Sequence, residues 1–324
     1  MTGNNTRQGY DVIGDIHGHA KELKALLKKL GYEHDGLCYR HPCRQALFLG
    51  DFVDRGPYQR EVIETVMAMC EGGAAHAIMG NHEFNALAFH TEYPGGSGQW
   101  LRPRTNKNIR QHLAFLRAYL GDDKELNRVL AWFRTLPLWL ELDEGLRLVH
   151  ACWYEPAMRR LQDKLGCNNT LTSDLLIEAS QIGSQAYDDV EALLKGREVK
   201  LPEGIHFTDK DGFERDQIRI RWWRNNAQSY ADLAQPPYVV ERNPRLNDLP
   251  LVQINDLGYP EDAPPVFFGH YWFEGTPQPE QSNVFCLDYS VPRETGKLAA
   301  YRWTSDQNPG EESFVWVNNG AGSA

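Results

Sequence analysis

The stretch 48–57, Phe-Leu-Gly-Asp-Phe-Val-Asp-Arg-Gly-Pro, constrains this chain more than any other. The apolar run 45–49 predicts a buried strand that a glycine ends. Asp51, Asp54 and Arg55 then follow on the loop at the strand's carboxyl end, where α/β sheets bind ligands. Burying three charges is costly unless they pair with each other or with a metal. A metal–phosphate site explains all three: Asp51 holds a cation, Arg55 a phosphate oxygen, and Asp54 orients a neighbour. A solvated turn before a proline-capped helix is the alternative.

The first 90 residues alternate between strand and helix patterns. A strand from residue 10 runs into a loop with Asp15 and His17, and leucines at 23, 26, 27 and 30 then predict a buried helix face. After the stretch 48–57, apolar residues at 62, 63, 66 and 70 predict a second helix, and strand 75–79 ends at Asn81 and His82. This order is β-α-β-α-β, with polar residues at each carboxyl end.

The remainder of the chain mixes helices, loops and short strands. We expect one domain over 1–324, in which the insertions 91–145 and 155–265 form a helical and loop-rich substrate cap. Strands are predicted at 145–149 before His150, at 217–223, and at 266–270, 284–287 and 298–303. Gly and Pro turns between the last three suggest hairpins of a second sheet, and 318–324 reads as a disordered tail.

Five strand ends therefore carry potential metal ligands. The six candidates are Asp15, His17, Asp51, Asn81, His150 and His270. Carboxylate, imidazole and carboxamide donors suit Mn, Fe, Zn or Co better than Mg or Ca. Six ligands exceed one tetrahedral site, and a carboxylate can bridge two ions, for which Asp51 is the natural choice. Two ions can activate a water molecule and hold the attacking and leaving oxygens of a phosphate.

The segment 93–121 contains no acidic residue but has five basic ones, Arg102, Arg104, Lys107, Arg110 and Arg117. Two amphipathic helices are predicted here, one with its apolar stripe over 109–120 and one over 126–133. In a chain with a net charge of -10, this basic helix over 102–117 either attracts an anionic substrate or is a solvated helix face.

The composition limits which binding partners and which cellular compartment we expect. The net charge of -10 argues against broad binding of nucleic acid or anionic membranes. The sequence has no apolar run of membrane-spanning length and a polar amino terminus. Its six cysteines are scattered, without a C-x-x-C pair, as is typical of reduced thiols. We expect a cytoplasmic protein; the sequence leaves its oligomeric state open.

Three blocks carry a family resemblance: 14–18 (Gly-Asp-Ile-His-Gly), 50–56 (Gly-Asp-Phe-Val-Asp-Arg-Gly) and 80–83 (Gly-Asn-His-Glu). They resemble the calcineurin-like metallophosphoesterases, within the branch of phosphoprotein phosphatases and diadenosine tetraphosphatases. The resemblance covers residues 10–90 and resumes around His150 and His270. It implies an α-β-β-α sandwich of two mixed sheets.

The resemblance also implies roles for individual residues. One metal would be held by Asp15, His17 and Asp51, and the other by Asp51 with the ligands Asn81, His150 and His270. His82, paired with Asp54, would be the general acid, while Arg55 and Asn81 would bind phosphate. A second phosphate-binding arginine has no clear match; among Arg219, Arg221 and Arg224 we favour Arg221.

Two features depart from the family pattern. The family's usual His-Gly-Gly or His-Ala-Gly is here His-Ala-Cys-Trp at 150–153, and the Ser-Ala-Pro-Asn-Tyr-Cys block of eukaryotic-type Ser/Thr phosphatases is absent. The segment 268–275 instead resembles symmetrical diadenosine tetraphosphatases.

Other candidates carry weaker patterns. The group His34, Cys38, His41 and Cys43 fits a hairpin rim better than a zinc site. Cys152 fits a buried structural thiol. His112, with other scattered histidines, reads as a surface or core residue. The tryptophans at 222, 223 and 272 fit either core packing or a base-stacking pocket.

These patterns together predict a phosphoric ester or anhydride hydrolase in which a metal-bridging hydroxide attacks phosphorus and His82 protonates the leaving group. Two divalent transition-metal ions are expected, Mn first, with Fe, Zn, Co or Ni as alternatives. The leading substrate is a nucleoside polyphosphate such as diadenosine tetraphosphate. A bacterial-type protein phosphatase acting on phospho-Ser, phospho-Thr or phospho-Tyr is the alternative, and an inactive metal-binding scaffold is a third reading.

Overall fold

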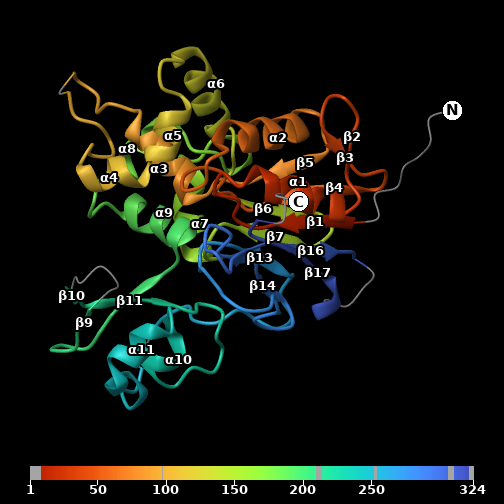
Figure 1. Ribbon diagram of the computed structural model, residues 1–324. Coiled ribbons are helices and arrows are strands. Elements are labelled where there is room, and N and C mark those ends of the chain that lie inside the picture. The colour runs from red at the N-terminus through yellow and green to blue at the C-terminus, as the bar shows by residue number, and fades with distance from the viewer. Residues whose placement is uncertain (1–8, 97, 209–213, 252–253, 306–309, 321–324) are drawn as a thin grey trace.

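The computed structural model describes residues 9–96, 98–208, 214–251, 254–305 and 310–320. Two mixed β-sheets form its centre, and helices pack around them (Figure 1). This architecture confirms the predicted α/β sandwich of two mixed sheets.

The first sheet contains the amino-terminal strands. Its order is β15 (Asp288–Tyr289), β16 (Lys297–Trp303), β1 (Gly9–Ile13), β4 (Arg44–Phe48) and β5 (Ala75–Ala77), with β17 (Phe314–Asn318) also paired to β16. Strands β1, β4 and β5 are parallel, as the β-α-β-α-β pattern predicts. Because the carboxyl ends of parallel strands lie at one edge, the loops after β1, β4 and β5 meet there.

The second sheet has the order β14 (Val284–Cys286), β13 (Val266–Phe268), β7 (Leu146–Val149) and β6 (Trp139–Leu142). The predicted hairpins were wrong for β13 and β14, which are parallel to each other, and β13 is also parallel to β7. All residues of β13 and β14 are buried, which is typical of parallel strands covered on both faces. Strand β16 returns to the first sheet, antiparallel to β1.

An apolar layer fills the space between the two sheets. It contains Val12 of β1, Leu47 of β4, Leu148 of β7 and Phe267 of β13, all fully buried. The ring of Phe267 stacks on that of Phe285 with centroids 4.7 Å apart. Since side chains alternate along a strand, neighbours of these residues face the helices instead.

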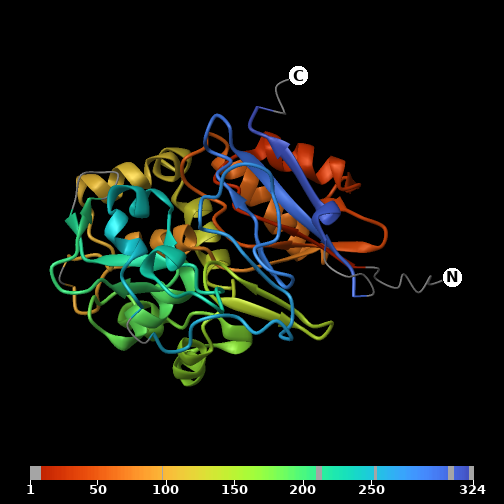
Figure 2. The same ribbon diagram turned by 90° about the horizontal axis from the view of Figure 1, so that it is seen from below.

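Three helices of the amino-terminal half cover or cap the first sheet. They are α1 (Ala20–Lys29), α2 (Gln59–Glu71) and α3 (Asn81–Phe89). The predicted apolar faces of α1 and α2 are buried, apart from Cys70 of α2, which is half-buried. Helix α1 packs against β16 and β17 from the carboxyl-terminal end of the chain, as Figure 2 shows in red and blue. A short hairpin, β2 (Glu33–His34) with β3 (Tyr39–Arg40), contains His34 and Cys38 of the four residues considered for zinc, and His41 and Cys43 follow it.

The insertion 91–145 begins with three helices: α4 (Asn106–Gln111), α5 (Leu113–Ala118) and α6 (Asp123–Phe133). The single apolar stripe predicted over 109–120 is two helices, because the chain breaks at His112. Leu120, assigned to that stripe, is 84% exposed.

The insertion 155–265 is mainly helical at first and then forms a small lobe away from α1 and α2 (Figure 1). Its helices are α7 (Glu155–Leu161), η1 (Gln162–Lys164), η2 (Cys167–Asn169), α8 (Ser173–Glu178), α9 (Gln185–Lys195), α10 (Tyr230–Leu233), α11 (Tyr238–Arg242) and η3 (Pro244–Asn247). Its strands are β8 (Glu198–Lys200), β9 (Phe207–Thr208), β10 (Glu214–Arg215), β11 (Gln217–Ile220) and β12 (Ala234–Gln235). The strand predicted over 217–223 thus ends at Ile220.

The carboxyl terminus is ordered further than expected. After η4 (Glu311–Ser313), strand β17 extends to Asn318, so the predicted tail 318–324 starts inside a strand. Residues 321–324 of that tail lie outside the described residues. Within the described ranges, no helix combines the length and hydropathy needed to cross a bilayer.

Truncating Phe267 tests the layer between the sheets. Phe267→Ala should lower the free energy of unfolding by about 3–5 kcal/mol, because it opens a cavity in a fully buried layer. Urea unfolding measures this loss. Leu120→Ala, at an exposed position, should stay within about 0.5 kcal/mol of the parent protein. Equal stability of the two variants would contradict the packing described here.

Candidate metal centre

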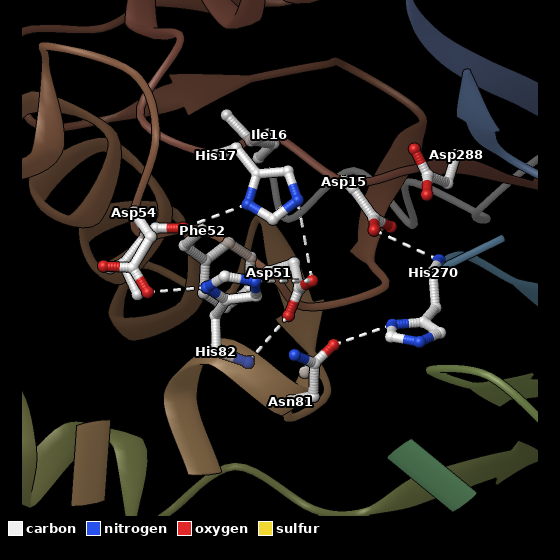
Figure 3. Close-up of polar contacts among 12 residues, drawn as sticks. Asp15, Ile16, His17, Asp51, Phe52, Asp54, Asn81, His82, His270 and Asp288 are labelled. Carbon is white, nitrogen blue, oxygen red and sulfur yellow. Dashed lines mark hydrogen bonds and ion pairs between the residues drawn. The ribbon is translucent and has the colours of Figure 1, made fainter. Parts of the chain in front are cut away.

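The five predicted ligand-bearing strand ends meet at one place in the structure. Figure 3 shows residues from the loops after β1 and β4, from the first turn of α3, and from the loop after β13 pointing toward one another. The six predicted ligands are all buried: Asp15, His17, Asp51, Asn81, His150 and His270. The alternative reading of the stretch 48–57 as a solvated turn is therefore wrong.

Asp51 lies at the centre of this group. Its Oδ2 is 3.6 Å from His17 Nε2, and its Oδ1 is 3.4 Å from His150 Nε2. Two sets of potential ligands share it: Asp51 with His17 and His82, and Asp51 with His150 and His270. In each set the ligand atoms lie within 4.8 Å of one another. One carboxylate between two sets of donors is the arrangement that a bridging ligand requires.

Several polar atoms at the centre are buried without a hydrogen-bond partner among the described residues. They are Asp15 Oδ1, His17 Nε2 and His270 Nε2. Asp15 is tied to the same place, since the backbone N–H of His270 donates to its Oδ2 (3.1 Å). Buried polar atoms are rarely left unpaired, so three in one cluster fit a site for cations.

Backbone carbonyls orient two of the histidines. His17 Nδ1–H donates to the carbonyl of Val53 (3.0 Å), and His150 Nδ1–H donates to that of Leu49 (2.7 Å). In both rings Nε2 therefore points toward Asp51. Such contacts to the second ring nitrogen are typical of metal-binding histidines.

The electrostatics at the centre favour positive charge. Burial lowers the pKa of His17 to about 3, which keeps this ring neutral with a free lone pair. Although burial opposes it, Asp51 raises the pKa of His150 to about 10. Burial and the neighbouring Asp288 raise the pKa of Asp15 well above its usual range. Cations held by these groups would relieve the repulsion between the buried carboxylates.

The backbone at the centre is strained. His17, Asp51, Asp54, Arg55 and His270 all have positive φ, between 47° and 69°. This left-handed region is uncommon for residues other than glycine, and such strain concentrates at functional sites. Gly269 is required beside them, because a Cβ there would lie 2.0 Å from Asp15 Oδ1.

Glu83 is a residue of the centre to which we assigned no role from the sequence. Its Oε2 accepts from the backbone N–H of Asp51 (2.8 Å) and of Gly80 (3.0 Å), and its Oε1 from that of Phe52 (2.9 Å). Burial and Asp51 raise its pKa to about 7. Glu83 thus joins the start of α3 to the loop after β4.

Asp54 lies between two histidines. His82 Nδ1–H donates to its Oδ2 (2.6 Å), and His112 Nδ1–H donates to its Oδ1 (2.8 Å). Although burial lowers the pKa of His82, Asp51 and Asp54 together raise it above its ordinary value. The sequence reading of His112 missed this contact. The sequence carries no signal for it, because a spacing of 58 residues from Asp54 forms no pattern.

Arg55 is exposed at the edge of the centre. Its guanidinium lies 4.1 Å from the centroid of the Trp272 ring, and no hydrogen bond or ion pair joins it to another described residue. Trp222 and Trp223 do not line a base-stacking pocket, because both are buried in the core.

The guanidinium of Arg221, the predicted second phosphate ligand, contacts β12 of the second insertion. Strand β11 ends at Ile220, so the alternation that placed Arg219 and Arg221 on one face stops before Arg221. The Nε of Arg221 donates to Gln235 Oε1 (3.1 Å). Arg219 is closer to the centre, since its charge helps to lower the pKa of His270, after burial.

A cavity of about 620 Å³ opens beside the candidate general acid. The centre contributes Asp54, Arg55, Asn81 and His82 to its wall. The remaining lining residues are Asn85 of α3, Arg102, Arg110, Gln111, Leu113, Ala114 and Arg117 of the first insertion, and Lys195 of α9. The centre is therefore open to ligands from the side of the first insertion.

The family profile described as calcineurin-like phosphoesterase matches residues 10–270. The chain belongs to this family. The matched range includes the strand ends that carry all six candidate ligands.

This calcineurin-like phosphoesterase matches its named relatives over about half of their length. An asymmetrical bis(5'-nucleosyl)-tetraphosphatase from Geobacillus thermodenitrificans is 34% identical over 44% of this chain and 56% of its own. A symmetrical bis(5'-nucleosyl)-tetraphosphatase from Hamiltonella defensa is 31% identical over 43% of this chain and 41% of its own. A solved structure of a cold-active protein tyrosine phosphatase is 16% identical over 97% of this chain and 80% of its own, with a TM-score of 0.50. At this level of identity, the likeness shows a similar fold.

Replacing His112 tests its contact with Asp54. His112→Phe keeps an aromatic ring on Phe115, whose centroid lies 4.7 Å away, but removes the donor to a buried carboxylate. Stability should fall by about 1.5–3 kcal/mol, as measured by urea unfolding. In a double-mutant cycle with Asp54→Asn, the combined loss should be smaller than the sum of the single losses. Additive losses would show that the two side chains do not interact.

Proposed function

We propose that this protein is a di-metal phosphoesterase that hydrolyses a phosphate ester or anhydride. The observation that carries the proposal is Asp51, shared by two sets of buried ligands with the His82–Asp54 pair directly beside it. Asp15, His17 and Asp51 would hold one ion, and Asp51, Asn81, His150 and His270 the other. His82 belongs to the first set by distance, but we assign it to proton transfer because its Nδ1–H is engaged by Asp54.

Two bound ions would supply an activated water molecule and neutralise charge on the phosphate. The mixture of carboxylate, imidazole and carboxamide donors favours Mn, with Fe, Zn, Co or Ni as alternatives. None of the six cysteines, all of which lie in the described ranges, forms a disulfide, which supports a reducing, cytoplasmic location.

Side chains of the protein itself would transfer the proton to the leaving group. Water oxygen bonds to phosphorus while the bond from phosphorus to the leaving oxygen breaks. His82 Nε2–H donates its proton to that oxygen, and Asp54 holds the ring in the orientation and charge state that this requires. The raised pKa of His82 keeps more of it protonated near neutral pH.

Phosphate would be bound by Arg55 and Asn81 at the edge of the cavity. The Arg55 guanidinium is exposed and presents several donors, which suits two oxygens of one phosphate. Arg221 stays the second candidate proposed from the sequence, and Arg219 is the alternative because its charge acts on His270. The insertions 91–145 and 155–265 would form the substrate cap, since both contribute to the cavity wall.

A nucleoside polyphosphate, such as diadenosine tetraphosphate, is the substrate class that we favour. The names of the two tetraphosphatase relatives support it, as do the basic residues of the first insertion on the cavity wall. A phosphoprotein is the alternative, and an inactive scaffold is disfavoured because it would not need the His82–Asp54 pair.

The role of His82 can be tested by removing its ring. His82→Ala should lower kcat at least about 100-fold, because proton donation to the leaving oxygen is lost, and should leave the metal content of the purified protein unchanged. Turnover assays and elemental analysis measure the two effects. His34→Ala on the exposed β2–β3 hairpin is the matched control and should change neither. Turnover by His82→Ala at the parent rate would refute this role.

The substrate class can be tested on the unmodified protein. With Mn, then Co, Ni or Zn added, we expect diadenosine tetraphosphate to be hydrolysed and a panel of phosphopeptides to be hydrolysed poorly. Chromatography of the products also separates two ADP from ATP plus AMP. Efficient dephosphorylation of the peptides with intact dinucleotide would move the protein to the phosphatase alternative. Hydrolysis of neither substrate by metal-loaded protein would support the scaffold.

A further inference from the structure

The cavity beside His82 has a charge opposite to that of the whole chain. Its wall includes five cationic side chains, Arg55, Arg102, Arg110, Arg117 and Lys195, and one carboxylate, Asp54. That carboxylate already accepts hydrogen bonds from two histidines. The chain as a whole has a net charge of -10. Such a local excess of positive charge focuses anions into a cleft.

The cations differ in how they are held. Arg102 is fixed by a neutral partner, since its Nη2 donates to Gln111 Oε1 (2.8 Å). Lys195 pairs with Glu191 on α9. Arg110 of α4 and Arg117 of α5 are exposed, and neither forms an ion pair with a carboxylate of the described residues. Two arginines that face one cavity without acidic partners have donors available for a ligand.

The cavity lies on the side from which the leaving group departs. A general acid must lie within hydrogen-bond reach of the leaving oxygen, and His82 is the residue of the pair that is partly exposed, at 12% of its side chain against 1% for Asp54. The same cavity wall contains His82 and both unpaired arginines. A group that leaves past His82 therefore enters a space lined by cations.

We propose that this cavity is a subsite for the leaving group and that this group is a chain of two or three phosphates, which Arg110 and Arg117 bind. The proposal rests on the proposed function. In the step concerned, water loses one proton to solvent as its oxygen bonds to phosphorus, the bond to the neighbouring phosphate oxygen breaks with its electron pair, and His82 gives that oxygen a proton. The substrate is then a phosphoanhydride with a polyanionic leaving group.

The size and charge of the cavity distinguish this substrate class from phosphopeptides. Its volume of about 620 Å³ lies within the ~300–1,000 Å³ of small-ligand pockets, so it has room for more than one phosphate. A seryl, threonyl or tyrosyl leaving group brings one oxygen on an uncharged side chain, for which the two arginines offer no electrostatic gain. Only an acidic peptide would make use of them.

The test compares one anhydride and one monoester substrate in a variant without the two charges. In Arg110→Gln with Arg117→Gln, the ratio of kcat/KM for diadenosine tetraphosphate to kcat/KM for p-nitrophenyl phosphate should fall at least about tenfold. In the parent protein, KM for the tetraphosphate should rise with ionic strength. An unchanged ratio would overturn the proposal. The same tenfold fall, measured with an acidic phosphopeptide in place of the tetraphosphate, would also overturn it, because the two arginines would then serve peptide substrates.

A matched control removes two positive charges from the same insertion but not from the cavity. Lys107 and Lys124 are exposed and do not line it. Lys107→Gln with Lys124→Gln should keep the parent ratio. An equal fall in this control would mean that net charge, and not the cavity, determines the preference, and would overturn the proposal.

Binding of inorganic tripolyphosphate separates failure of this proposal from failure of the proposed function. If the parent protein hydrolyses neither substrate, the phosphoesterase assignment fails but the subsite can still be measured by calorimetry. The Arg110 and Arg117 double variant should bind tripolyphosphate at least about fivefold more weakly than the parent protein, whereas the lysine variant should match it. Equal binding by all three proteins would overturn the subsite.

Discussion

The buried carboxylate of Asp51 lies where the strand ends of the two sheets meet, and histidines from three separate segments surround it. A buried charge is costly in isolation, so the surroundings must compensate for it. They do so through the imidazoles of His82 and His150 and through the backbone N–H of His82, which donates to Asp51 Oδ1 (2.9 Å). Burial raises the pKa of Asp51, but these histidines bring it well below its usual range. The carboxylate thus stays ionised and ready to bind cations.

The rest of the fold makes this arrangement possible. Parallel strands β1, β4 and β5 end at one edge, and β7 and β13 of the second sheet end beside them. The apolar layer between the sheets holds the two edges together. Its packing offsets the cost of several left-handed residues and of unpaired polar atoms at the centre. The core therefore stabilises a fold whose strand ends are themselves destabilising.

The first insertion connects the centre to its cavity. The break between α4 and α5 places His112 on Asp54, while the two helices on either side of the break carry Arg110 and Arg117. One short segment therefore both supports the His82–Asp54 pair and lines the space next to it. The insertion therefore helps to hold Asp54 in the orientation in which it pairs with His82.

The sequence by itself determined which residues could form the centre. Short apolar runs that end in Asp, His or Asn are local patterns, and they predicted the strands and the positions of six candidate ligands, all of which are buried. It could not determine contacts that depend on distant segments. The pairing of His112 with Asp54 and the bonds of Glu83 to the loop after β4 have no local signal, because they arise when the insertion and α3 fold onto the sheet. The alternation expected over 217–223 put Arg219 and Arg221 on one face, but β11 ends at Ile220, and Trp222 and Trp223 after it are buried in the core. Likewise, the direction of β13 and β14 followed from burial on both faces, which only the assembled sandwich provides.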